Sequence, residues 1–205
     1  MSWYEEKMLP RLMNIACSSK PHHKQREKIV PRASGDVLEI GFGGGLNLAH
    51  YDQDKVRRIW GLEPSAGMRK LAEEKIADTK LDVELIDLPG EEIPLEDNSV
   101  DTVLITFTLC TIPEAATALD GMRRVLKSGG QLLFSEHGKA PDANVVKWQD
   151  RMNPVWKKVS GGCNMNRDIP ALLDAAGLEI QDDNRMYTPG LKSLSYMYWG
   201  AATIR

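Results

Sequence analysis

A cluster of glycines follows a short apolar run in the first quarter of the chain. The run Val37–Ile40 leads directly into the stretch Gly41–Gly45, and an acid, Glu39, lies two residues before the first glycine. Glycines have no Cβ, so they let backbone amides approach a ligand without obstruction. A second acid, Glu63, ends the next apolar run, where its carboxylate can accept hydrogen bonds from both hydroxyls of a ribose. Together these features predict a ligand that contains a nucleoside.

Two cofactor families use such a glycine loop. The dinucleotide fingerprint G-x-G-x-x-G would require glycine at position 46, where Leu46 stands, and usually has an apolar residue in place of Glu39. An acid followed by G-x-G-x-G instead resembles motif I of the class I S-adenosylmethionine-dependent methyltransferases. That cofactor carries an ammonium and a carboxylate rather than a pyrophosphate, so a nearby acid and exposed amides suit it. The residues that this motif would assign to the cofactor are Glu39, Gly41, Gly43, Gly45 and Asn47.

Three further segments carry the same resemblance in the same order. Gly61–Ser65 ends the second strand with Glu63, Ile93–Asp101 is similar to "LPFPDNSFD", and Arg124–Gly130 is similar to "RVLKPGG". One departure is that Pro89 replaces the acid of the family's "GDAE", so adenine would rest on the backbone of Gly90–Glu91 and on apolar packing. The additional cofactor residues implied by the resemblance are Glu63, Pro64, Gly90, Glu91 and Thr106.

A subfamily resemblance extends beyond the cofactor segments. Phe107–Ile112, Glu136-His137 and Gly161–Arg167 are similar to bacterial phospholipid-type methyltransferases and to the animal methyltransferase-like 7 proteins, which methylate alkyl thiols. The animal members carry an N-terminal hydrophobic membrane anchor, which this sequence does not show. The resemblance implies methyl transfer to a small, lipophilic acceptor. Sulfur is favoured, and oxygen or nitrogen stays open. A phospholipid amine, a non-catalytic cofactor-binding role and an NAD(P)-dependent oxidoreductase are the alternatives.

Three residues are candidates for the acceptor site. His137 follows the fifth predicted strand, where open α/β sheets place their ligands, and serves either as a catalytic base or as a structural hydrogen-bonding group. Cys110 follows the fourth strand and is either a small core residue or a neighbour of the transferred methyl group. Trp148 lies in the segment that commonly covers the acceptor. No metal site is predicted, because Cys17, Cys110 and Cys163 lack metal-ligand spacing and His22-His23 are expected at the surface.

Short apolar runs alternate with helical patterns from Asp36 onward, which predicts an α/β fold. We expect a Rossmann-like, doubly wound, seven-stranded and mostly parallel sheet with an antiparallel last strand. One helix is expected to start at Pro113 and to end at Gly129-Gly130. The predicted strands are 37–40, 58–62, 83–86, 100–106, 131–135, 178–186 and 193–204, and the other helices are 65–77, 142–159 and 168–176.

The chain is predicted to form one domain over residues 1–205, with a helical lid (1–32), a cofactor-binding core (36–138), an acceptor-covering segment (140–166) and a C-terminal helix with strands (167–205). The lid would carry an apolar stripe at Met8, Leu9, Leu12, Met13 and Ala16, with Trp3 and Tyr4 at the mouth of the pocket. Docking of the stripe on the back of the sheet is the alternative. The basic stretch Lys20–Arg32 is either a solvated helix face or a contact for an anionic group.

Composition excludes several classes of protein. The 205 residues carry a net charge of -3, which argues against a general nucleic-acid binder. No apolar run approaches the roughly 20 residues needed to cross a bilayer, and no signal-peptide pattern opens the chain. Peripheral lipid contact and the oligomeric state stay open. The odd number of cysteines suits a reducing cytoplasm, and the expected partner is a small-molecule acceptor.

Overall fold

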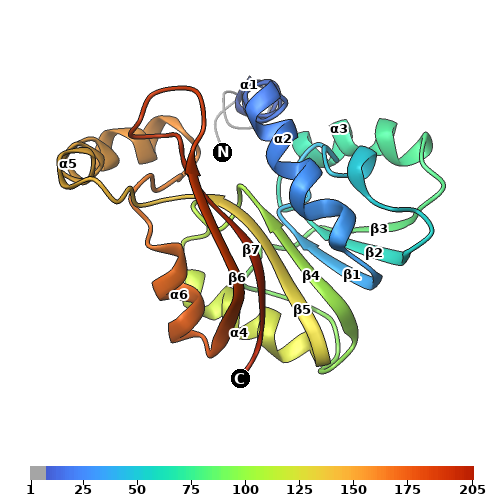
Figure 1. Ribbon diagram of the computed structural model, residues 1–205. Helices are drawn as coiled ribbons and strands as arrows, with labels where there is room; N and C mark the ends of the chain where they lie inside the picture. The colour runs from blue at the N-terminus through green and yellow to red at the C-terminus, as the bar shows by residue number, and fades with distance from the viewer. Residues whose placement is uncertain (1–7) are drawn as a thin grey trace.

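Seven strands form one sheet in the computed structural model, which describes residues 8–205. Their order across the sheet is β3-β2-β1-β4-β5-β7-β6 (Figure 1). The first five strands pair in parallel, whereas β7 runs antiparallel to both β5 and β6. This confirms the predicted Rossmann-like sheet. The strands are β1 (Gly35–Ile40), β2 (Val56–Leu62), β3 (Asp82–Ile86), β4 (Val100–Thr106), β5 (Leu126–His137), β6 (Leu178–Tyr187) and β7 (Tyr196–Ile204).

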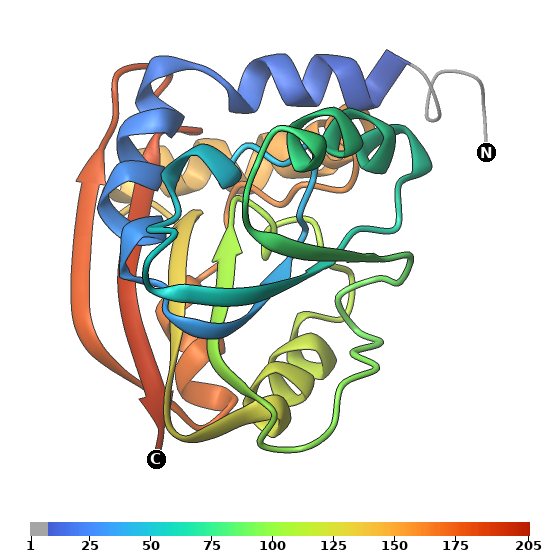
Figure 2. The same cartoon turned by 90° about the vertical axis from the view of Figure 1, so that its right-hand side faces the viewer.

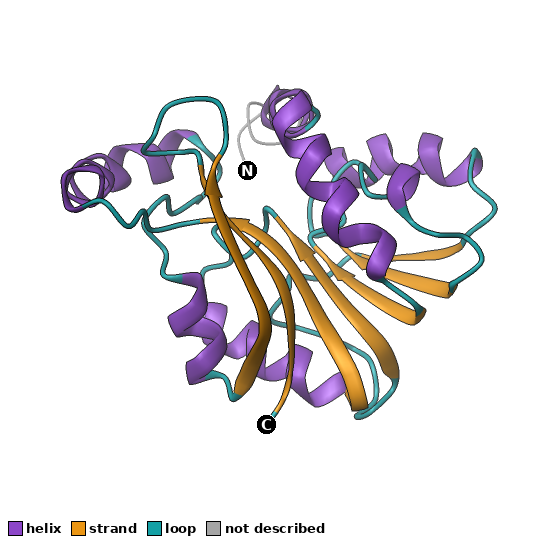
Figure 3. Cartoon of the chain, in the orientation of Figure 1, coloured by secondary structure: helices purple, strands orange, loops and turns teal. Residues whose placement is uncertain are grey.

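Helices cover both faces of the sheet (Figure 3). One apolar cluster packs α4 and α6 against one face, and a second packs α2 and α3 against the other. The central strands β1 and β4 are therefore buried on both sides, which explains why β4 is almost entirely β-branched or leucine. The helices are α1 (Leu9–Cys17), α2 (Lys20–Ile29), α3 (Ala66–Ala77), α4 (Ala115–Val125), α5 (Ala143–Val159) and α6 (Ile169–Ala175), with 3-10 turns at η2 (Val30–Arg32) and η3 (Leu48–His50).

The chain reverses its direction of travel across the sheet between β1 and β4. β1 pairs with β2 on one side and with β4 on the other, so the loops after β1 and β4 diverge at their carboxyl ends. Open α/β sheets bind their ligands at such a switch point. The glycine loop 41–45 and the turn 107–111 both leave the sheet there.

The helix α4 is shorter than predicted at both ends. It begins at Ala115 rather than Pro113, and it ends at Val125, well before Gly129-Gly130. The carbonyls of Arg124 and Val125 accept hydrogen bonds from the amides of Asn98 and Ser99, which turns the chain directly into β5. The two glycines lie inside that strand, where Gly129 has a φ of +80° beside a register shift.

The two N-terminal helices occupy different environments. In α2, Ile29 is fully buried in the same apolar cluster as the sheet residues. In contrast, α1 lies along α3 at the end of the sheet (Figure 2), with the Asn14 side chain next to Gly44. Two residues of the predicted stripe of α1 are not covered, since Met8 and Leu12 are 42% and 50% exposed. Trp3 and Tyr4 lie outside the described residues.

Within residues 8–205, no helix is both long enough and apolar enough to span a lipid bilayer.

The same substitution on each N-terminal helix separates a core element from a loosely held one. Ile29→Ala is expected to lower the free energy of unfolding by about 2–5 kcal/mol, because it leaves a cavity in a closed core. Ile15→Ala on α1, where the side chain is 68% exposed, should change it by less than about 0.5 kcal/mol. Urea unfolding followed by circular dichroism measures both. Equal losses in the two variants would contradict this assignment.

Candidate active site

The glycine loop has the shape of a cradle at the switch point. Gly41, Gly43 and Gly45 have φ values of +72°, +57° and +70°, a region that L side chains rarely adopt. A Cβ on Gly41 would approach the Thr108 side chain to 2.3 Å, so this glycine lets the loop meet the turn after β4. A Cβ on Gly43 would find no atom closer than the Gly41 carbonyl at 3.8 Å, so this position faces open space. The loop therefore fits a ligand that lies against its backbone.

Glu63 lies directly beside this cradle. Its Oε2 accepts a hydrogen bond from the Gly43 amide and its Oε1 accepts one from the Ser65 amide, each at 2.9 Å. Burial raises the pKa of the carboxyl, against the effect of these two backbone hydrogen bonds. Each carboxylate oxygen keeps a second lone pair for a ribose hydroxyl. The carboxylate thus supports the loop and fits the nucleoside of S-adenosylmethionine, while Pro64 after it is exposed.

Glu39, Asn47 and Thr106 form a buried network beneath the loop. The Glu39 carboxylate accepts hydrogen bonds from Asn47 Nδ2 at 2.9 Å and from Tyr51 Oη at 2.6 Å. Asn47 Nδ2 also donates to Thr106 Oγ1 at 2.9 Å. Burial raises the pKa of Glu39 to about 7. These residues hold the loop from below, and Tyr51 is a member that the sequence analysis missed.

Arg26 of α2 is a second residue that sequence reasoning missed. Its Nε donates to Asn47 Oδ1 at 2.9 Å, its Nη1 donates to the Cys17 carbonyl at 2.7 Å, and its guanidinium lies over the Phe107 ring. The predicted basic stretch Lys20–Arg32 therefore has two kinds of environment, because Arg26 is buried whereas Lys20 and Lys24 are exposed. The signal was available as spacing: Gln25, Arg26 and Ile29 share the buried face of the helix.

The segment expected to hold adenine borders the carboxyl end of β1. Gly90 is buried, and a Cβ there would come within 2.9 Å of Ile40 and 3.0 Å of Ile112. The Glu91 carboxylate accepts a 3.3 Å hydrogen bond from the Glu114 amide. A surface depression of about 760 Å³ lies between this segment and α4, but the glycine loop and Glu63 do not line it.

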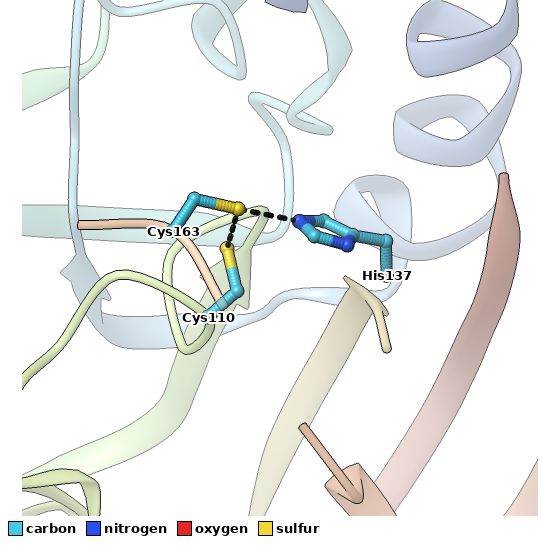
Figure 4. A group of neighbouring side chains, drawn as sticks. All are labelled: Cys110, His137 and Cys163. Carbon is cyan, nitrogen blue, oxygen red and sulfur yellow. Dashed lines mark hydrogen bonds between the residues drawn. The ribbon is translucent and has the colours of Figure 1, made fainter. Parts of the chain in front are cut away.

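On the other side of the switch point, three side chains from distant parts of the chain converge (Figure 4). Cys110 belongs to the turn after β4, His137 ends β5, and Cys163 follows α5. The Cys163 sulfur lies 3.1 Å from His137 Nε2 and 3.5 Å from the Cys110 sulfur. Cys163 was not a predicted site residue, because no local spacing links it to the other two.

These three groups perturb one another strongly. The pKa of the Cys163 thiol is lowered to about 4, first by its hydrogen bond with Cys110 and then by His137. Its hydrogen bond with Cys163, followed by burial, raises the pKa of Cys110 well above the ordinary value. Burial alone would lower the pKa of His137, but the hydrogen bond to Cys163 and nearby negative charge outweigh burial and raise it. Burial raises the pKa of neighbouring Glu136 to about 7.

One expected neighbour of the acceptor site, Trp148, lies elsewhere. The Trp148 side chain is 61% exposed on an outer stripe of α5, so the structure does not bring it to Cys110 and His137. Trp156, one of the half-buried residues of α5, lies beside Cys163 and contributes to the low pKa of that thiol. His22 was expected at the surface, yet its ring packs edge-on against Phe107 with 4.6 Å between centroids.

Comparison with known proteins settles the family. Residues 38–134 match the family model described as a methyltransferase domain. The chain is 34% identical over 187 residues to the human thiol S-methyltransferase TMT1B, covering 85% of this chain and 75% of that protein. The chain belongs to the class I S-adenosylmethionine-dependent methyltransferases of the TMT1 type. It is an enzyme of that class, with S-adenosylmethionine as its cofactor.

Two further proteins are similar to the chain, one in sequence and one in fold. A phosphatidylethanolamine N-methyltransferase of Cereibacter sphaeroides is 30% identical over 135 residues, which are 63% of this chain and 65% of that protein. The crystal structure of an S-adenosylmethionine-dependent methyltransferase from Aquifex aeolicus superposes with a TM-score of 0.64 at 20% identity, covering 96% of this chain and 98% of that one. At this identity the structural match shows the fold alone.

The cofactor half of the site is tested by removing one carboxylate. Glu63→Ala should weaken S-adenosylmethionine binding by about 1.5–3 kcal/mol, because hydrogen bonds to a charged group are lost. Isothermal titration calorimetry measures the effect. Glu84→Ala is the matched control. It removes an exposed carboxylate of β3 that pairs with Arg58 of β2, and this variant should bind S-adenosylmethionine like the parent. A folded Glu63→Ala protein with parental affinity would place the ribose elsewhere.

The buried position of His22 predicts a pH dependence. Its pKa is lowered to about 4, first by burial and then by Arg26, whereas an unfolded histidine titrates near 6.5. The folded state therefore disfavours the protonated ring, so the stability contribution is complete above pH 6.5 and is lost as the pH falls toward 4. In His22→Phe, the free energy of unfolding should fall less than in the parent between pH 7.5 and pH 5. Parallel pH profiles from urea unfolding would refute this.

Proposed function

We propose that this methyltransferase acts on the sulfur of a small, lipophilic thiol. The observation that carries the proposal is the 34% identity with a thiol S-methyltransferase over 85% of the chain. S-adenosylmethionine supplies a methyl group on a sulfonium that is already activated for in-line displacement. The chain's own residues then need to align the acceptor and to exclude water.

The charge distribution near the turn after β4 supports a sulfur acceptor. A thiolate is the reactive form of a thiol, and a positive environment lowers the pKa at which it forms. Arg26 provides a buried guanidinium over Phe107, and the pKa of His137 is raised. His137 is accordingly proposed as the catalytic residue that helps to stabilise the acceptor's thiolate, in keeping with its position at the end of β5.

The lining of this region supports a lipophilic acceptor. Phe107 and Trp156 are half-buried aromatic residues, and Cys110 is a small buried side chain in the same turn as Phe107. Cys110 and His137 are the proposed acceptor contacts, while Trp148 on the outer stripe of α5 is not retained.

A reducing cytoplasmic location is part of the proposal, since all three cysteines are free thiols.

A phospholipid amine is the second candidate acceptor. It is favoured by the similarity to the phosphatidylethanolamine N-methyltransferase. An amine must first lose a proton near its pKa of about 10, which calls for an available base. Glu136, the carboxylate next to His137 in the sequence, is fully buried, and one of its oxygens accepts a hydrogen bond from the Thr108 amide at 2.8 Å. The sulfur acceptor ranks first because the identity with the thiol S-methyltransferase covers 85% of the chain, against 63% for the N-methyltransferase.

A panel of matched acceptors tests the proposal. We expect S-adenosylhomocysteine to form with an alkyl thiol, and not with the alcohol or amine of equal chain length or with phosphatidylethanolamine vesicles. Mass spectrometry should identify the methyl thioether. Turnover with the vesicles instead would support the phospholipid amine. Calorimetric binding of S-adenosylmethionine without turnover of any acceptor would indicate a non-catalytic binding protein.

A further inference from the structure

The group formed by Cys110, His137 and Cys163 has the composition of a metal site. Their ligand atoms, two sulfurs and one imidazole nitrogen, all lie within 4.8 Å of one another. The two cysteines are free and buried, and His137 is half-buried. The three residues come from different segments, namely the turn after β4, the end of β5 and the loop after α5 (Figure 4). The fold therefore places three soft or borderline donors around one point.

We propose that these three residues bind a Zn²⁺ ion and that the acceptor's sulfur takes the fourth coordination position. Zinc bonds of about 2.3 Å to sulfur and about 2.0 Å to nitrogen give tetrahedral separations of about 3.8 Å between sulfurs and about 3.6 Å between sulfur and nitrogen. The observed separations are 3.5 Å for the two sulfurs and 3.1 Å for Cys163 and His137. Small side-chain movements would therefore accommodate the ion.

The number of ligands points to a reactive site rather than a purely structural one. Among the His, Cys, Asp and Glu side chains of residues 8–205, the group close enough to share the ion consists of these three. Structural zinc sites are closed by four protein ligands, whereas sites with three keep one position for water or substrate. The neighbouring carboxylate of Glu136 accepts a hydrogen bond from the Thr108 amide and lies outside this group.

The metal site shares a turn with the cofactor cradle. Thr108 is the residue that Gly41 approaches, and its carbonyl accepts a 2.8 Å hydrogen bond from Thr111 within the same turn. Cys110 lies between these two residues, and its own carbonyl accepts a 2.9 Å hydrogen bond from the Asn164 amide beside Cys163. The three proposed ligands and the cradle therefore meet at the turn after β4.

The chemistry of the acceptor follows from coordination, and this step rests on the proposed thiol function. Cys110 and Cys163 lose their protons when they bind the ion, because thiols that coordinate zinc are deprotonated. The acceptor thiol likewise releases its proton to solvent as it displaces water. Its sulfur lone pair forms the new S–C bond while the C–S⁺ bond of the sulfonium breaks and its electron pair stays on S-adenosylhomocysteine. The product is a neutral thioether, a weaker ligand, and dissociates.

Metal binding is tested without any methyl transfer. The full chain, reduced and stripped with a chelator, is titrated with Co²⁺, which reports cysteine ligation through sulfur-to-cobalt charge-transfer bands and tetrahedral geometry through visible d–d bands. We expect one ion per chain, displaced by Zn²⁺. Loss of an outer-shell partner alone costs up to about 100-fold in affinity, so Cys110→Ala and Cys163→Ala should each lose more than that.

Cys17→Ala is the matched control, because this cysteine lies on α1 and is outside the group. It should bind Co²⁺ like the parent. Absence of the charge-transfer bands in the parent chain overturns the metal site, whether or not the alanine variants fold. Equal bands in the parent and in a folded Cys110→Ala/Cys163→Ala variant overturn it as well.

The fourth position is tested with the cobalt-loaded parent. An alkyl thiol should add sulfur-to-cobalt intensity, and the alcohol of equal chain length should not. Bands that do not respond to the thiol would refute acceptor coordination. Turnover of the thiol by a fully metal-free parent would refute the metal's role in the reaction and leave the thiol function standing. If the cobalt spectrum responds to the thiol but no thioether is formed, the proposed function would be wrong and the metal site would stand.

Discussion

The site depends on one buried amide. Asn47 donates through Nδ2 to Glu39 at the end of β1 and to Thr106 at the end of β4, and it accepts through Oδ1 from Arg26 of α2. It thereby links the two strands of the switch point to the N-terminal helix. No apolar residue of similar size could satisfy a carboxylate, a hydroxyl and a guanidinium together. The position of the glycine loop above this network follows from it.

The network also explains how opposite charges coexist beneath the loop. A buried guanidinium or carboxylate is costly unless its hydrogen bonds are satisfied. Arg26 meets this condition through Asn47 and the Cys17 carbonyl, and Glu39 through Asn47 and Tyr51. Asn47 lies between the two charges, so the guanidinium lies over Phe107 while the carboxylate stays beneath the glycine loop.

The residues proposed for the cofactor could be named from the sequence because their signals are local, and the structure brings Glu63 to the glycine loop. The glycines and Glu63 are fixed by the end of a strand and the turn that follows, and strand periodicity gave the sheet almost completely. The errors have long-range causes. The end of α4 is set by hydrogen bonds from Asn98 and Ser99, which lie on another segment. The outward direction of Trp148 depends on which face of α5 is buried, and Gln149, not the tryptophan, fills that face.

Cys110 and His137 could be proposed from their places after two strands, but their contact with Cys163 could not be predicted, because it exists only in three dimensions. Gln149 donates to the carbonyls of Gly138 and Met165, tying α5 to the end of β5 and to the segment after Cys163. Asn164 bonds to the Cys110 carbonyl through both its amide and its side chain. These contacts bring together cysteines separated by 53 positions. The packing of α5 and of the segment after it therefore fixes Cys163 beside Cys110, whereas the glycine loop is held separately by the hydrogen bonds of Asn47.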